Sequence, residues 1–167
     1  MIKITIKQRS IIEEKVDAIV NPSNSYGLMN GGVGAAIKAV GGNIIEVDAM
    51  RNSPIRIGES LVTTGGMLFA GHIIHSPTMQ LPSEKATEEN IRKAVRSSLK
   101  AADDNRFSRI AMPGMGTGTG EFEPIDAAKI IIEEINGFKA RNLKEVILVD
   151  ISETMVNAFK DAMKIKN

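Results

Sequence analysis

Residues 17–42 read Asp-Ala-Ile-Val-Asn-Pro-Ser-Asn-Ser-Tyr-Gly-Leu-Met-Asn-Gly-Gly-Val-Gly-Ala-Ala-Ile-Lys-Ala-Val-Gly-Gly. The stretch opens with a short apolar run typical of a buried strand, and the polar residues 21–25 then indicate a loop. A helix is predicted after two glycines, because apolar residues recur at helical spacing at Val33, Ala36, Ile37 and Val40. Gly41 and Gly42 end it as a C-terminal cap pair. Backbone N–H groups exposed at such a helix start can bind an anion.

A second glycine-rich segment, residues 110–120, reads Ile-Ala-Met-Pro-Gly-Met-Gly-Thr-Gly-Thr-Gly. It begins in another predicted strand and precedes a helix that opens at Pro124. Its alternating glycines and threonines provide a backbone that can approach an anion closely, together with two hydroxyl donors. Both glycine loops are expected at the carboxyl edge of one sheet, where two N–H-rich loops suit a diphosphate. Neither loop has the spacing of the dinucleotide fingerprint or of a P-loop.

These two segments together resemble the signature of the macro domain family. In that family a strand ending in Val-Asn-x-x-Asn leads through a glycine-rich turn into the first helix, and a second glycine loop follows downstream. The resemblance covers the chain from Met1 to about Lys164. It implies one domain over residues 1–167 with a three-layer α/β/α fold and a mixed, mostly parallel central sheet of about six strands. It also implies that the ligand is ADP-ribose or an ADP-ribose derivative, free or attached to a protein.

The remaining chain alternates predicted strands with helices, which by itself indicates a layered α/β domain. Strands are expected at residues 2–7, 17–21, 59–64, 71–76, 109–113 and 146–149. The first of these alternates isoleucine with polar residues and should lie at an edge. The second helix, residues 43–50, is expected to bury Ile44, Ile45, Val47 and Met50. Thr87 and Ser152 should cap two later helices, the last of which is expected to turn Met155, Val156, Phe159, Ala162 and Met163 inward. Residues 77–82 are expected to form a loop.

The resemblance also implies a set of ligand-binding residues. Asn24 falls on the family asparagine that contacts the distal ribose, whereas Asn21, beside Pro22, is either a turn former or a second ligand contact. The predicted binding residues are Ser10, Ile11, Asn24, Gly31, Gly32, Val33, Gly34, Gly116, Thr117, Gly118, Thr119, Gly120 and Ile151.

Three positions depart from the family pattern. Gly34 stands where members that hydrolyse ADP-ribosyl esters often carry an aspartate. Ser10 and its neighbours occupy the region of the usual adenine-binding aspartate, and Ile151 replaces an aromatic residue that often stacks on adenine. Asp150 is a possible substitute acceptor for the adenine amine. We therefore expect a binding module, with a hydrolase of O-acyl-ADP-ribose or of ADP-ribosylated proteins as the alternative.

Catalytic residues are not identified by the sequence. Asn24 and Glu121 are the candidates, because Glu121 is the carboxylate nearest in sequence to the second glycine loop. His72 and His75 alternate with isoleucines in a strand, and His75 is expected to be structural. Without cysteine or neighbouring carboxylates these histidines do not predict a metal site, and no cofactor is implied.

Composition narrows the alternatives further. A net charge of +1 and 4% aromatic residues disfavour a nucleic-acid-binding surface, which leaves a nucleotide- or RNA-binding domain as the third hypothesis. The amino terminus alternates instead of forming an apolar signal segment, and no run approaches the ~20 apolar residues of a membrane span. A cytoplasmic protein without membrane contact is expected.

Overall fold

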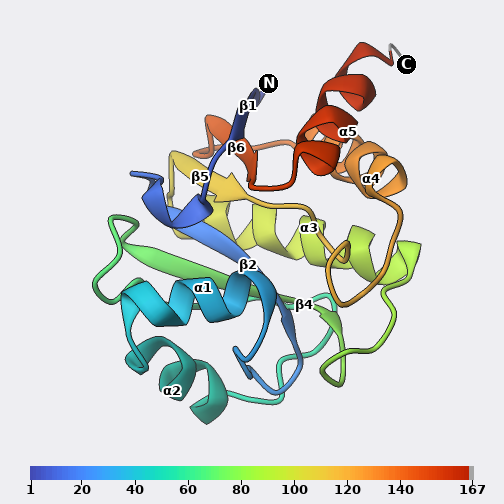
Figure 1. Ribbon diagram of the computed structural model, residues 1–167. Coiled ribbons are helices and arrows are strands. Elements are labelled where there is room, and N and C mark those ends of the chain that lie inside the picture. The colour runs from blue at the N-terminus through green and yellow to red at the C-terminus, as the bar shows by residue number, and fades with distance from the viewer. Residues whose placement is uncertain (166–167) are drawn as a thin grey trace.

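A computed structural model describes residues 1–165, and its centre is a six-stranded sheet with the strand order β1-β6-β5-β2-β4-β3 (Figure 1). The strands are β1 (Lys3–Gln8), β2 (Ala18–Asn24), β3 (Leu61–Thr64), β4 (His72–Met79), β5 (Arg109–Met112) and β6 (Glu145–Asp150). Neighbouring strands are parallel except for β3, which runs antiparallel to β4. The mixed, mostly parallel sheet predicted from the sequence is confirmed, and β1 lies at an edge as expected.

Helices cover both faces of this sheet (Figure 1). They are α1 (Gly32–Gly41), α2 (Ile44–Arg51), α3 (Glu88–Asp104), α4 (Pro124–Gly137) and α5 (Glu153–Lys164), with a short 3-10 helix η1 (Ile11–Glu13). One apolar core joins the sheet to α3, α4 and α5, and a second joins its other face to η1, α1 and α2. Thr87 and Ser152 cap α3 and α5 as predicted, because each side chain accepts a hydrogen bond from an N–H of the first turn.

Two strands are longer than the sequence indicates. β2 continues past Val20 to Asn24, and β4 continues to Met79 instead of ending before a loop. The two strands pair with each other through Pro22 and Pro77, with a bulge after Ser23. Beyond Ile19, β2 pairs with β4 alone, and such a strand edge tolerates a proline. The asparagine-proline sequence therefore lies in a strand, so the interpretation of Asn21 as a turn former is wrong.

The buried sides of three helices also differ from the predictions. Along α1 the buried positions are Gly34, Ile37 and Gly41, whereas Val40 is exposed. On α2 the buried residues are Ile45 and Ala49, while the remaining apolar side chains Ile44, Val47 and Met50 lie on the surface. Met163 at the end of α5 is exposed as well. Helical periodicity predicted where the helices lie. It did not predict the buried face of α1, because two of the three buried residues, Gly34 and Gly41, are glycines, which a pattern of apolar side chains does not include.

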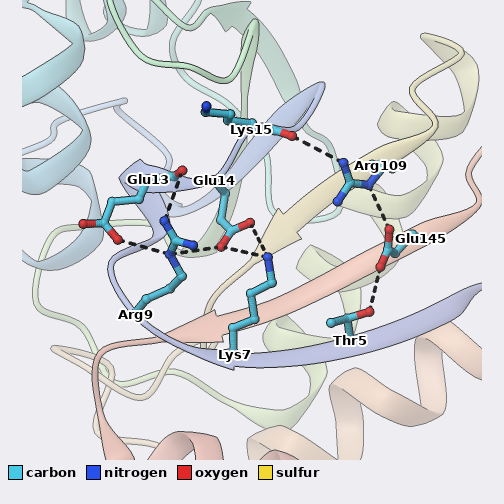
Figure 2. Close-up of polar contacts among 8 residues, drawn as sticks. All are labelled: Thr5, Lys7, Arg9, Glu13, Glu14, Lys15, Arg109 and Glu145. Atoms are coloured by element: carbon cyan, nitrogen blue, oxygen red, sulfur yellow. Dashed lines mark hydrogen bonds and ion pairs between the residues drawn. The ribbon is translucent and has the colours of Figure 1, made fainter.

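Polar contacts and ion pairs connect β1 to the segment after η1, to β5 and to β6 (Figure 2). Glu14 is 3% exposed and pairs with Lys7 Nζ at 3.1 Å and with Arg9 Nε at 3.4 Å. Further along the sheet, Glu145 accepts hydrogen bonds from Thr5 at 2.6 Å and Arg109 at 2.8 Å. These two donors lower the pKa of Glu145, the Thr5 hydroxyl contributing most. The contacts of Glu14 hold η1 against the edge strand, and η1 forms one wall of the cavity described next.

Candidate ligand-binding site

A cavity of about 680 Å³ opens at the carboxyl ends of β2, β4, β5 and β6, between the start of α1 and the glycine loop after β5. This is the edge at which parallel α/β sheets bind their ligands. Every residue predicted to bind ligand lines this cavity: Ser10, Ile11, Asn24, Gly31, Gly32, Val33, Gly34, Gly116, Thr117, Gly118, Thr119, Gly120 and Ile151. The fold thus brings together segments that lie more than a hundred residues apart in the chain.

The first turn of α1 presents bare backbone to the cavity. Gly31 is the N-cap, with an extended φ of −153°, and no side chain caps the helix. The first helical bond runs from Ala35 N–H to the Gly31 carbonyl, so the preceding N–H groups of the turn have no partner among residues 1–165. A Cβ at Gly31 or Gly32 would meet open space. Open donors of this kind at a helix N-terminus are suited to an anion.

The glycines of the second loop have two different roles. Gly116, at φ +75°, packs so closely on Ala86 that a Cβ would lie 2.8 Å from its methyl group. A Cβ on Gly120 would lie 2.6 Å from the carbonyl oxygen of Gly116, so both glycines are needed to close the loop. Gly118 differs, since a Cβ there would meet nothing within 4 Å. Gly118 also lines the cavity, as the start of α1 does.

The cavity has no basic lining. Among the residues that form its walls, Asp150 alone carries a charge. Its carboxylate accepts hydrogen bonds from the backbone N–H groups of Gly114 at 3.0 Å and Ser152 at 2.9 Å, so it fixes the start of the glycine loop. An anion in this cavity would consequently be held by backbone dipoles. Whether Asp150 also accepts a bond from adenine stays a prediction.

The cavity lining also includes apolar residues. Ile11, in η1, is buried against the second core, and Ser10 precedes it without a side-chain cap bond. Ile151 follows β6 and is 75% exposed at the rim. A planar group lying between Ile11 and Ile151 would cover apolar surface without an aromatic partner.

The two asparagines of the first motif both line the cavity but differ in their hydrogen bonds. Asn24 organises its own loop: its Oδ1 accepts from Tyr26 N–H at 3.0 Å and Leu28 N–H at 3.3 Å, and its Nδ2 donates to the Leu28 carbonyl at 2.9 Å. Asn21 is 1% exposed and has an unpaired Oδ1 within the described part of the chain. This difference could not be predicted from the sequence, because the partner of Asn21 is His75, on another strand.

His75 is completely buried between two polar partners. Its Nδ1 lies 3.2 Å from Asn21 Nδ2, and its Nε2 lies 2.9 Å from Thr63 Oγ1. Burial lowers the pKa of His75 to about 4, which keeps the ring neutral near pH 7. As predicted, His75 is a structural residue; His72, on the same strand, is exposed and packs on Phe107.

His75 should make the protein less stable in mild acid. Below about pH 6.5 the unfolded chain binds a proton at this histidine, whereas the folded chain does so only near pH 4. The free energy of unfolding should therefore fall between these two values, by on the order of 3 kcal/mol in total. We expect denaturant titrations at pH 7, 5.5 and 4.5 to show this loss. It should disappear in His75→Asn and persist in the matched variant His72→Asn; an equal slope in both would contradict the assignment.

Neither position 34 nor the catalytic candidate Glu121 provides a carboxylate to the cavity. Gly34 is helical and buried, and contributes no side chain. Glu121 does not line the cavity; it is 67% exposed and lies 3.8 Å from Lys85. Within residues 1–165 no cluster of three histidine, aspartate or glutamate residues could hold a metal ion. The same residues include no helix long and apolar enough to span a membrane.

Known proteins with similar sequences and structures are macro domains or their relatives. A sequence model of the Macro domain matches residues 20–131. An uncharacterized protein of Aquifex aeolicus is 44% identical over 98% of this chain and 99% of its own length. The structure resembles the Oceanobacillus iheyensis macrodomain solved with ADP, with a TM-score of 0.84 and 27% identity over 95% of this chain and 88% of that one. It also resembles the Trypanosoma brucei macrodomain in complex with ADP-ribose, with a TM-score of 0.87 and 24% identity over 96% of this chain and 68% of that one.

Proposed function

The chain belongs to the macro domain family, and on this premise we propose that its cavity binds ADP-ribose or an ADP-ribose derivative. The observation that supports the proposal most directly is the pair of open backbone surfaces at Gly31–Gly32 and Gly118, which border one cavity without any basic side chain. Two such surfaces match the two phosphates of a diphosphate. The related Oceanobacillus iheyensis macrodomain was solved with ADP, which contains that group.

The same recognition applies to free ADP-ribose and to ADP-ribose attached to a protein, because both present the same diphosphate and sugars. The absence of a carboxylate at Gly34 favours a binding module over an ester hydrolase. Ile11, which lines the cavity and packs on the second core, provides apolar surface that suits a base. RNA binding is less well supported, because the residues that line the cavity include no basic side chain and no aromatic side chain on which a base could stack.

Isothermal titration calorimetry against ADP-ribose, AMP, NAD and a short RNA tests this proposal. We expect ADP-ribose to bind with a dissociation constant on the order of micromolar, more tightly than AMP, and the RNA not to bind. Because backbone dipoles replace lysine or arginine, the affinity should change by less than about threefold between 50 and 500 mM NaCl. Binding of RNA without binding of ADP-ribose would refute the proposal.

A further inference from the structure

The chain enters α1 through an irregular segment that has few hydrogen bonds of its own. Residues 29–31, the entry segment, belong to no helix or strand, and Asn30 and Gly31 line the cavity. Among the backbone N–H groups of residues 29–34, only that of Met29 has an acceptor within residues 1–165. The Met29 side chain is buried, whereas Asn30 and Gly31 are exposed. The position of the open N–H groups at the start of α1 therefore depends on what holds Met29 and Asn30.

Glu46 and Lys38 hold these two residues. A short turn brings α2 back against α1, so that Glu46, in the first turn of α2, lies beside Lys38 of α1. Glu46 Oε2 accepts a hydrogen bond from Met29 N–H at 2.7 Å and another from Lys38 Nζ at 3.2 Å. Lys38 Nζ also donates to Asn30 Oδ1 at 3.2 Å. A backbone N–H and an ammonium can only donate and a carboxylate can only accept, so the directions of the bonds to Glu46 are fixed.

The bonds to Glu46 are partly shielded from water, since the side chains of Lys38 and Glu46 are 24% and 18% exposed. Hydrogen bonds to a carboxylate are stronger than those between neutral groups, and partly buried ion pairs are less screened by salt than exposed ones. Removing the carboxylate would leave Met29 N–H without its acceptor and the Lys38 charge without its ion-pair partner. Other arrangements of the entry segment would then be populated beside this one.

We propose that Glu46 is a positioning residue, which holds the entry segment and the open N–H groups after it in the arrangement that receives the ligand's diphosphate. Neither Glu46 nor Met29 lines the cavity, so Glu46 acts through the backbone and does not touch the ligand. The inference rests on the proposed function and deepens it, since it names a residue that preorganises the same site. When only a fraction of a protein has the binding-competent arrangement, its apparent affinity is reduced by that fraction.

Two substitutions at Glu46 test this role by calorimetry. Glu46→Ala removes the acceptor of Met29 N–H, whereas Glu46→Gln keeps an oxygen that can accept the same bond. We expect the dissociation constant for ADP-ribose to rise about 5–10-fold in Glu46→Ala, as for a competent arrangement that is about 10–20% populated, and at most about twofold in Glu46→Gln. ADP should show the same changes as ADP-ribose, because it carries the same diphosphate.

Glu134→Ala is the matched control for a general loss of stability. Glu134 lies on α4, is mostly buried, and forms ion pairs with Arg92 and Arg96 of α3. It does not line the cavity. We expect thermal unfolding at a lower temperature in Glu134→Ala, with the affinity for ADP-ribose unchanged. Unchanged affinity in folded Glu46→Ala, equal losses in the two Glu46 variants, or an equal loss in Glu134→Ala would overturn the inference.

Amide hydrogen exchange provides a measurement that needs no ligand. In the unmodified protein the Met29 N–H should exchange at least ~10-fold more slowly than the Asn30 N–H, relative to their intrinsic rates. This protection should persist in Glu46→Gln and be lost in Glu46→Ala. An unprotected Met29 N–H in the unmodified protein would overturn the positioning role even if ADP-ribose binds. Failure of ADP-ribose to bind, with Met29 N–H protected as expected, would instead refute the proposed function while leaving the anchoring of the entry segment intact.

Discussion

Replacing Gly31 with glutamate should abolish binding of ADP-ribose, lowering its affinity by at least ~100-fold, or about 2.7 kcal/mol. Gly31 is the N-cap of α1 in an extended conformation that any residue adopts, and a side chain there enters open space. The new carboxylate would lie over the unpaired N–H groups of the first turn, where a helix dipole favours a negative charge. It would occupy the donors assigned to the diphosphate and also repel that group.

Calorimetry with ADP-ribose measures this loss, and thermal unfolding confirms that the variant is folded. Gly137→Glu is the matched control, because this glycine ends α4, also borders open space, and undergoes the same charge change away from the cavity. Gly31 is the better choice than Gly32, whose φ of +55° would strain any side chain. Unchanged affinity in folded Gly31→Glu would remove the start of α1 from the binding site.

The sequence predicted the fold because its strongest signals are local. Apolar runs such as residues 146–149 and the capped helix at Thr87 specify their elements without tertiary information. The ends of β2 and β4 were missed because the asparagine-proline and serine-proline pairs usually stop a strand. In the folded protein these two strands support each other through that region, and β2 has one free edge there.

Part of the candidate site could likewise be predicted from the sequence, and part could not. The two glycine loops could be predicted to meet, because each follows a strand of one parallel sheet. The roles of individual glycines could not, since only the fold shows that Gly116 touches Ala86 while Gly118 borders open space. The contrast between Asn21 and Asn24 depends on hydrogen bonds to a strand 54 residues away and to a neighbouring turn, respectively. Residue type alone gives both asparagines the same chemistry.

Introducing an aspartate at Gly34 should raise the hydrolysis of O-acetyl-ADP-ribose by about 10²–10⁴-fold over a slow parent protein. Gly34 is helical, so the backbone strain expected of a positive φ does not arise. A Cβ there would lie 3.4 Å from Asn21 Oδ1 and 3.4 Å from Met29 Cα, which is ordinary van der Waals contact. Gly34 lines the cavity, so the new carboxylate would lie where hydrolysing members of the family often carry an aspartate.

There the carboxylate can act as a general base. It would take a proton from water as the water oxygen bonds to the acyl carbon, and the ribose oxygen would leave with a proton, giving acetate and ADP-ribose. Gly34→Asn is the matched control, because it has nearly the same shape but no base. Glu121→Gln should change nothing, since Glu121 is exposed and lies toward Lys85. Acetate release is the measurement, with ADP-ribose affinity determined for every variant.

The outcomes distinguish the two functions considered. In the first outcome, the parent binds ADP-ribose and releases little acetate, Gly34→Asp gains turnover, and Gly34→Asn does not. This outcome would show that the protein binds without hydrolysing because it lacks a carboxylate at position 34. An equal gain in both variants would show that shape, and not proton transfer, limits the reaction. Rapid acetate release by the parent that Glu121→Gln leaves intact would show that the cavity activates water without a carboxylate at position 34 or at Glu121.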